Sequence, residues 1–203
     1  MPLIESATFT LILWALIGYG LGSIPFGLLL TQLLGLGNLR EIGSGNIGAT
    51  NVLRTGNKTA AALTPLLLDA GKGVVAVLLA RIYAGEDAAQ LAALMAMLGH
   101  CYPVWLGFKG GKGVATFLGL MWALAWPVGL GCSIAWALAA FLTRISSMGG
   151  LMAAAVSTFL LVLSGNGSML LLGIALTLLV FWRHRANITR IRQGTEPKIG
   201  QKS

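Results

Sequence analysis

Glycine and lysine gather in one polar stretch in the middle of an otherwise apolar sequence. Residues 99–116 read GHCYPVWLGFKGGKGVAT, with four glycines and two lysines between positions 107 and 113. Backbone without a Cβ atom approaches a ligand closely, and clustered N–H groups beside lysine form a cradle for an anion. We therefore expect this loop to hold a phosphate through Lys112 and the glycines Gly110, Gly111 and Gly113.

This loop is not a nucleotide-binding P-loop. A P-loop whose lysine is Lys112 needs glycine at position 106 and serine or threonine at position 113. The sequence has Leu106 and Gly113 instead. Phosphate binding without nucleotide hydrolysis remains as the interpretation.

A second polar stretch, GSGNIGATNVLR at 43–54, offers hydroxyl, amide and cationic groups. Arg54 is a fixed, bidentate cation suited to phosphate, and Ser44 leads the polar side chains. The alternative is a loop whose polar residues cap a helix. The further candidates for phosphate contact are Gly43, Gly45, Asn46, Gly48, Thr50 and Asn51.

The two histidines each stand beside a basic stretch. His100 precedes the glycine loop, and His184 lies three residues before Asn187, on the same face of a helix. A lone histidine is often a hydrogen-bonded structural residue; the alternative is a general base or a donor to phosphate. Neither histidine has aspartate five residues later, which excludes the HxxxxD pair of the CoA-dependent glycerolipid acyltransferases.

Weaker candidates complete the set. Arg144 with Ser146 and Ser147 places a cation and two hydroxyls at a helix junction, and we treat these three as secondary site candidates. Asp69 and Lys72 lie three residues apart within an apolar run, where an ion pair must satisfy itself, so we expect a structural pair near the cytoplasmic end. The sequence offers no convincing set of metal ligands and no sign of a cofactor.

The composition is that of an integral membrane protein. Of the 203 residues, 56% are hydrophobic and 10% are charged, and the mean hydropathy is +0.82; soluble domains carry about 25% charged residues. We expect one membrane-embedded domain over residues 1–203. The N-terminal apolar run lacks the basic region of a signal peptide, so we interpret it as the first membrane helix.

Seven apolar runs predict an all-α bundle of about seven transmembrane helices with glycine-rich cytoplasmic loops. With the N-terminus outside, 12 of the 14 lysines and arginines fall on one side, which the positive-inside rule makes cytoplasmic. Merging the two short runs around Pro127 into one span would scatter these charges over both sides. The runs are approximately 7–34, 59–84, 88–106, 114–126, 128–143, 149–164 and 168–182, and small residues with Pro25 predict a kink in the first.

Four cationic, glycine-rich clusters on one membrane face favour chemistry that starts from an activated phosphate compound. Catalysis is then mainly positioning and charge neutralisation. An acyl phosphate fits, because its phosphate leaves readily once its charge is held and its chain can lie between helices. A transporter or flippase of an anionic phosphorylated metabolite or lipid is the alternative, although a transporter commonly has broken helices that meet near the midplane.

The motifs together resemble a known family, the bacterial acyl-phosphate:glycerol-3-phosphate acyltransferases of the PlsY type. The resemblance runs through nearly the whole chain, in GSIPFG at 22–27, in the two loops above and in HRANITRIRQGTE at 184–196. It implies transfer of a fatty acyl group from acyl phosphate to the 1-hydroxyl of sn-glycerol 3-phosphate. The products are lysophosphatidic acid and inorganic phosphate, in the first step of phospholipid synthesis.

The resemblance also implies roles for individual residues. Ser44, Arg54 and Lys112 match residues at the active site of the family, and His184 and Asn187 match a motif that helps to bind glycerol 3-phosphate. The proton acceptor stays open between the phosphate of the substrate, His184 and His100. We expect a monomer in the bacterial inner membrane that acts in the lipid bilayer on acyl phosphate and glycerol 3-phosphate, without nucleic acid, metal, CoA or acyl carrier protein.

Overall fold

The computed structural model describes residues 2–41, 47–52, 56–57 and 64–200, and these residues form helices and loops without a strand. All-α architecture was predicted from the seven apolar runs and is confirmed. The α-helices are α1 (Thr8–Gly22), α2 (Phe26–Leu33), α3 (Ala49–Val52), α5 (Ala70–Ala84), α6 (Glu86–Cys101), α7 (Val114–Leu124), α8 (Trp126–Thr143), α9 (Ser146–Leu163), α10 (Leu170–Arg183) and α11 (Arg185–Arg192). A π-helical segment, η2 (Thr64–Asp69), leads into α5, and short 3₁₀ turns cover Val104–Leu106 and Gly167–Met169.

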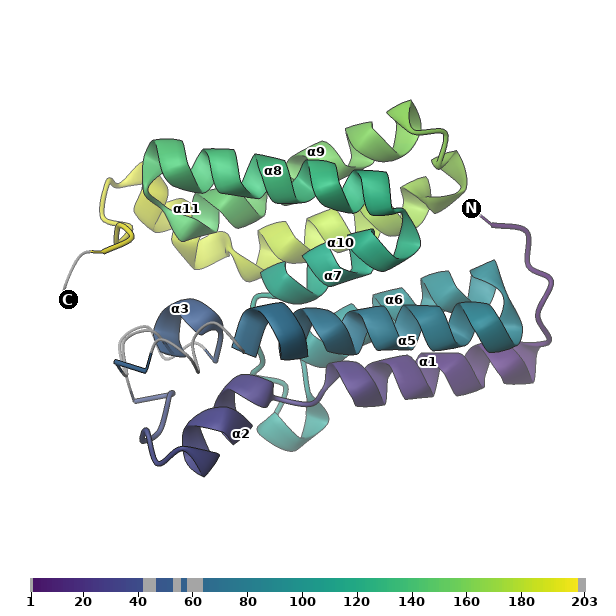
Figure 1. The fold of residues 1–203 in the computed structure, drawn as a ribbon, viewed down its shortest axis with the longest axis horizontal. Coiled ribbons are helices and arrows are strands. Elements are labelled where there is room, and N and C mark those ends of the chain that lie inside the picture. Colours follow the sequence, from purple (N-terminus) through teal and green to yellow (C-terminus); the bar gives the residue numbers. More distant parts are fainter. Residues whose placement is uncertain (1, 42–46, 53–55, 58–63, 201–203) are drawn as a thin grey trace.

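The long helices form one bundle with two groups that meet at α7 (Figure 1). In one group α1 packs against α5 and α6, and in the other α9 lies between α8 and α10. Helix α7 contacts α5 on one side and α8 on the other. The core between them contains many alanines, including Ala92, Ala93 and Ala96 of α6, which let the helices approach closely.

The first apolar run is broken where a kink was predicted. Helix α1 ends at Gly22, and α2 starts after Pro25, which has no N–H to continue the helical ladder. The ammonium group of Lys72 donates a hydrogen bond to the carbonyl oxygen of Ile24 at 2.9 Å. A carbonyl that the break exposes therefore has a buried partner.

Lys72 also forms the predicted ion pair with Asp69, at 2.9 Å, and both side chains are buried. The hydroxyl of Thr116 in α7 donates to the backbone carbonyl of Asp69 at 2.9 Å. The pair thus joins the start of α5 to α7 and to the α1–α2 break. This geometry agrees with the structural role expected for the two residues.

The two short runs around Pro127 are separate helices. The chain reverses at Ala125, and α7 and α8 lie side by side, with the Cα atom of Trp122 2.6 Å from where a Cβ atom of Gly129 would stand. Arg81 caps the end of α7 by donating to the carbonyls of Ala123 at 2.6 Å and Leu124 at 3.2 Å. A single merged span is excluded by this turn.

Among the described residues, four helical segments are long and apolar enough to cross a membrane, and a fifth forms if α10 and α11, bent by 60°, count as one. Helix α7, with 11 residues, is short for a crossing. The predicted number of seven spans is therefore not confirmed. The four segments are Thr8–Leu33, Glu86–Leu106, Trp126–Thr143 and Ser146–Leu163.

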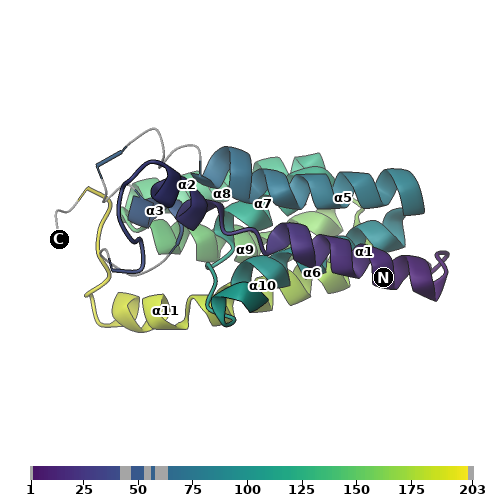
Figure 2. The ribbon, with the colours of Figure 1, turned by 90° about the horizontal axis from the view of Figure 1, so that it is seen from below.

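Polar segments lie at one end of the bundle. Figure 1 shows α2, α3, α11 and the C-terminus at that end, and the N-terminus at the opposite end. The view from below agrees, with α2, α3 and the end of α11 again on the side of the C-terminus (Figure 2). Elements that are far apart in the sequence, α2 and α3 in the first third and α11 near the C-terminus, therefore lie at the same end of the bundle.

The close packing of α1 on α6 gives a matched test. A Cβ atom at Gly22 would overlap the backbone carbonyl of Ala96, whereas one at Gly20 would meet nothing within 4 Å. We expect Gly22→Ala to lower the thermal unfolding midpoint of the protein in detergent by roughly 5 °C or more. Gly20→Ala should leave the midpoint unchanged or raise it, because alanine favours a helix over glycine by roughly 0.5–1 kcal/mol. Equal midpoints for the two variants would contradict the packing.

Candidate functional site

The structure describes one part of the predicted site. Lys112, the glycine loop, both histidines, Asn187 and the residues around Arg144 are described. Gly48 and Asn51 are described as well, and Asn51 is buried, with its side-chain amide donating to the carbonyl of Leu39 at 2.8 Å. Outside the described residues lie Gly43, Ser44, Gly45, Asn46, Arg54 and the side chain of Thr50.

The glycine loop is fastened to the end of α6 by its N–H groups. Gly110 donates to the carbonyl of Cys101 at 3.1 Å, and Gly111 donates to the carbonyl of His100 at 3.0 Å. These carbonyls stand in the last turn of α6, where helical partners are missing. The two N–H groups are therefore not available for the anion cradle that the glycines predicted.

Steric contact explains why these two positions are glycine. A Cβ atom at Gly110 would overlap the backbone oxygen of His100, and one at Gly111 would overlap the imidazole of His100. Gly113 has a φ of 83°, in the left-handed region, and a Cβ atom there would overlap the side chain of Met97. The glycines pack the loop against α6.

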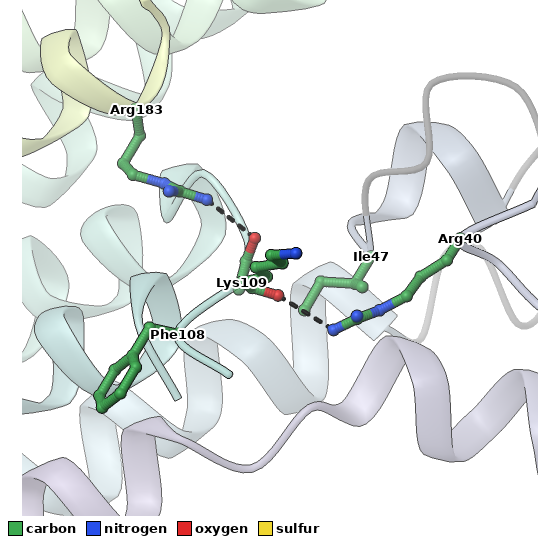
Figure 3. A pocket seen from close by; sticks show the side chains of 6 residues that line it. Arg40, Ile47, Phe108, Lys109 and Arg183 are labelled. Atoms are coloured by element: carbon green, nitrogen blue, oxygen red, sulfur yellow. Dashed lines mark hydrogen bonds between the residues drawn. The ribbon is translucent and has the colours of Figure 1, made fainter. Parts of the chain in front are cut away.

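Arginines hold the carbonyl side of the loop (Figure 3). Arg183 donates from Nε to Gly111 at 3.0 Å and from Nη2 to Gly110 at 2.9 Å. Arg40 reaches the loop from the opposite side and donates to the carbonyl of Lys109 at 3.1 Å. Neither arginine was a site candidate, because a basic residue beside a membrane helix was counted as a topological charge.

A cavity of about 290 Å³ opens next to these contacts. Among the described residues that line it, three are cationic and none is acidic, so its charge suits an anion. Of the predicted site residues that the structure describes, Gly110 alone lines it. The lining residues are Arg40, Ile47, Phe108, Lys109, Gly110 and Arg183.

Lys112 follows the fastened part of the loop and is half-buried. Gly113 is the N-cap of α7, so Lys112 stands directly before the first turn of that helix. The first N–H groups of a helix lack helical partners and carry partial positive charge. The ammonium group of Lys112 and the partial positive charge of this helix end both favour an anion.

His100 lies behind the loop. Its side chain is buried, its ring faces Gly111, and its Nδ1 is 3.8 Å from the carboxylate of Asp69. It is not among the residues that line the cavity. This position suits a packing residue better than a general base.

His184 occupies the bend between α10 and α11 and is buried. Its Nδ1 is 2.8 Å from the carbonyl oxygen of Val180, and because a carbonyl only accepts, Nδ1 carries the hydrogen. The other nitrogen, Nε2, lies 3.6 Å from where a Cβ atom of Gly150 in α9 would stand; that atom would also lie 2.6 Å from Val114. Gly150 thus lets the histidine and the start of α7 approach each other.

Asn187 is buried in α11 and is held by Glu196, which was not among the predicted site residues. The Glu196 carboxylate accepts from Asn187 at 2.5 Å, from Ser147 at 2.7 Å and from Arg190 at 2.7 Å. The Oδ1 atom of Asn187 is buried and has no hydrogen-bond partner within the described part of the chain. Glu196 could have been noticed as the single carboxylate in the basic tail.

Burial alone raises the pKa of Glu196, but the three hydrogen bonds and the charge of Arg190 outweigh it and hold the pKa below its ordinary value of 4.5. Arg190 is therefore paired within the fold, with Glu196.

The Arg144 cluster divides in the structure. Arg144 has a left-handed φ of 59°, and its carbonyl accepts from the N–H of Ile199 at 2.6 Å, so it helps to hold the C-terminal tail. Ser146 starts α9, and Ser147 reaches the Asn187 network through Glu196. Ser147 is therefore linked to Asn187, a predicted site residue, through Glu196. The guanidinium of Arg144 instead faces the carbonyl of Ile199 in the tail.

The comparisons of this chain with known proteins agree with one another. The family model described as glycerol-3-phosphate acyltransferase matches residues 12–194. Proteins of that name from Ruegeria pomeroyi and Roseobacter denitrificans are 71% and 67% identical to this chain, over 203 and 200 residues; the alignments cover 100% and 98% of this chain and all of each relative.

Crystal structures of PlsY (YgiH), an integral membrane glycerol 3-phosphate acyltransferase, are similar throughout. The glycerol 3-phosphate form has a TM-score of 0.88 and 36% identity and covers 94% of this chain and 96% of that one. The lysophosphatidic acid form has a TM-score of 0.85 and 34% identity, with 94% and 95% covered. None of these relatives supports the alternative of a transporter or flippase.

The contact between Gly111 and His100 gives a test by double substitution. Gly111→Ala should lower the thermal unfolding midpoint, because the methyl group overlaps the imidazole. His100→Ala should restore part of that loss in the double variant, since it removes the overlapping ring. The control is Gly110→Ala, whose overlap is with the His100 backbone and should persist with His100→Ala. Equal coupling in both pairs would contradict this packing.

The Glu196 anchor gives a pH-dependent test. Because the folded pKa lies below 4.5, the ionised carboxylate stabilises the fold above that pH, and the benefit is lost as pH falls through the folded pKa. We expect Glu196→Gln to lower the unfolding midpoint at pH 7, and the gap from wild type to close at acidic pH, below the folded pKa of Glu196. Glu41→Gln, at an exposed position, should show a small gap at either pH. A gap for Glu196→Gln that persists at low pH would contradict the anchor.

Proposed function

The chain belongs to the glycerol-3-phosphate acyltransferase family, and from this premise we propose that its acyl donor is an acyl phosphate. The protein is an integral membrane enzyme that acylates glycerol 3-phosphate to lysophosphatidic acid. The observation that best supports the donor is the polar end of the bundle, where cationic groups from distant parts of the chain meet beside apolar helices. Such a site suits a molecule with a phosphate at one end and a hydrocarbon chain at the other.

The reaction needs one bond formed and one broken at the acyl carbon. The 1-hydroxyl oxygen of glycerol 3-phosphate attacks the carbonyl carbon of the acyl phosphate, and the bond from that carbon to the phosphate oxygen breaks. The hydroxyl proton leaves with the inorganic phosphate or with a base. Because phosphate is already a good leaving group, the protein has chiefly to align the reactants and neutralise their charge.

Lys112 and Arg54 are proposed to hold phosphate groups, with Ser44 as a hydroxyl partner. The position of Lys112 before α7 supports this role, since the helix end adds to the charge of the ammonium group. Asn187, whose buried Oδ1 lacks a partner among the described residues, is proposed to accept a hydrogen bond from a substrate hydroxyl. The remaining glycine and amide candidates at 43–51 are proposed to shape the opposite wall.

Two proton acceptors are proposed in order of preference. The first is a phosphate oxygen of the substrate, and the second is Nε2 of His184, which is free to accept when Nδ1 donates to Val180. His100 is the weakest of the three candidates because its ring faces Gly111 behind the loop. The basic end is proposed to face the cytoplasm, with the N-terminus outside and the enzyme a monomer in the inner membrane of a bacterium.

Substitution of the phosphate-binding cations tests this function. Purified protein in detergent should release phosphate from acyl phosphate only when glycerol 3-phosphate is added. Lys112→Ala and Arg54→Ala should abolish that release without unfolding the protein, whereas Lys58→Ala should have a mild effect as a topological charge. Lys58 lies outside the described residues. Wild-type turnover in the Lys112 or Arg54 variant would falsify the phosphate-binding role. Complete loss of turnover in the Lys58 variant would show that Lys58 is wrongly assigned as a topological charge.

A further inference from the structure

Arg183 connects two parts of the site that are distant in sequence. It is the last residue of α10 and directly precedes His184, yet its guanidinium binds the loop that directly precedes Lys112. The link spans 72 residues to Gly111 and 73 to Gly110. No other described side chain bonds to both of these carbonyls.

The contact is bidentate and specific to arginine. Nε and Nη2 donate to two successive carbonyl oxygens, at 3.0 and 2.9 Å, and the guanidinium lies over the ring of Tyr102, with Cζ 5.0 Å from the ring centre. A planar fork makes two parallel bonds, whereas a lysine ammonium offers one compact charge. Charge and geometry can therefore be separated by substitution.

The loop needs such support. Its N–H groups at Gly110 and Gly111 are bound to α6 on one side, and the same peptide segment is bound by Arg183 on the other. Just before it, Phe108 has a φ of 60°, a left-handed conformation that bulky residues disfavour. Strained backbone of this kind persists only where surrounding contacts determine it.

We infer that Arg183 is a positioning residue whose guanidinium, through the carbonyls of Gly110 and Gly111, fixes the loop that carries Lys112 relative to the bend that carries His184. Its predicted effect on turnover rests on the proposed function. Its effect on the loop does not, because hydrogen bonding of the loop to α6 is measurable without substrate.

Arg185 provides a matched control. It lies two residues further on, carries the same charge and is exposed. It stacks on Trp182, with Cζ 4.7 Å from the ring centre, and makes no hydrogen bond to the glycine loop within the described part of the chain. Variants Arg183→Lys, Arg183→Gln, Arg185→Lys and Arg185→Gln therefore compare equal changes of charge. A purely electrostatic role at this end of the bundle would affect both positions alike.

The first measurement is amide hydrogen exchange of the full-length protein in detergent, followed by mass spectrometry of peptides that cover residues 105–116. Both Arg183 variants should exchange faster than wild type at Gly110 and Gly111, and both Arg185 variants should match wild type. Unchanged exchange in the Arg183 variants would overturn the inference. If Arg183→Gln does not fold, Tyr102→Leu, which removes the ring beneath the guanidinium, should give a smaller acceleration in the same peptides.

The second measurement is steady-state phosphate release with varied glycerol 3-phosphate. Both Arg183 variants should lower kcat/KM by about 10- to 100-fold, the order of loss that misplacement of a reacting group causes. Retained turnover in Arg183→Lys with loss in Arg183→Gln would overturn the inference, because charge alone would then suffice. If wild-type protein releases no phosphate while loop exchange responds as expected, the proposed function fails and the positioning role stands.

Discussion

The end of α6 sets the geometry on which the rest of the site depends. Its last carbonyls, at His100 and Cys101, have no helical partner, and leaving such groups unsatisfied beside hydrocarbon is costly. The N–H groups of Gly111 and Gly110 satisfy them. This pairing draws the loop so close to α6 that only glycine fits at both positions. The same peptide segment then directs its own carbonyls outward, where arginine is the side chain that can bind two at once.

The bilayer explains why polar groups gather at one end of the bundle. Charged side chains are expensive within the hydrocarbon region and are retained there only when they are paired. Asp69 and Lys72 follow this rule, because they pair with each other. Lys72 also donates to the carbonyl of Ile24, and the backbone carbonyl of Asp69 accepts from Thr116, so these two residues join neighbouring helices. Among the described cations, Arg81 caps the end of α7 and Arg190 binds Glu196. Three others line the cavity, namely Arg40, Lys109 and Arg183. Basic residues that the positive-inside rule counts therefore also make structural contacts, Arg190 with Glu196 and Arg183 with the glycine loop.

Local composition was sufficient to predict the apolar helices, the break before Pro25 and the pairing of Asp69 with Lys72. Each depends on residues within a few positions of one another. The arginine contacts of the glycine loop and the Glu196 network were not predicted, because their partners lie up to 73 residues apart and their types are ordinary for a basic tail. The glycines were identified as important but for another reason. A pattern of Gly and Lys does not distinguish N–H groups that await a ligand from N–H groups already bound to a neighbouring helix.

This distinction determines which groups are left to bind phosphate in the mechanism that we propose. In a P-loop, backbone N–H groups supply much of the binding, and the lysine adds to them. Here two of the candidate N–H groups are bound to α6, so the phosphate recognition that we propose depends on cationic side chains and on the N-terminal end of α7. Side chains placed by distant contacts are sensitive to the packing of whole helices, whereas a backbone cradle is largely local. On this proposal the positions of α6, α7 and α10 shape the binding site, and the dependence is most direct at Arg183, which contacts the loop from the end of α10.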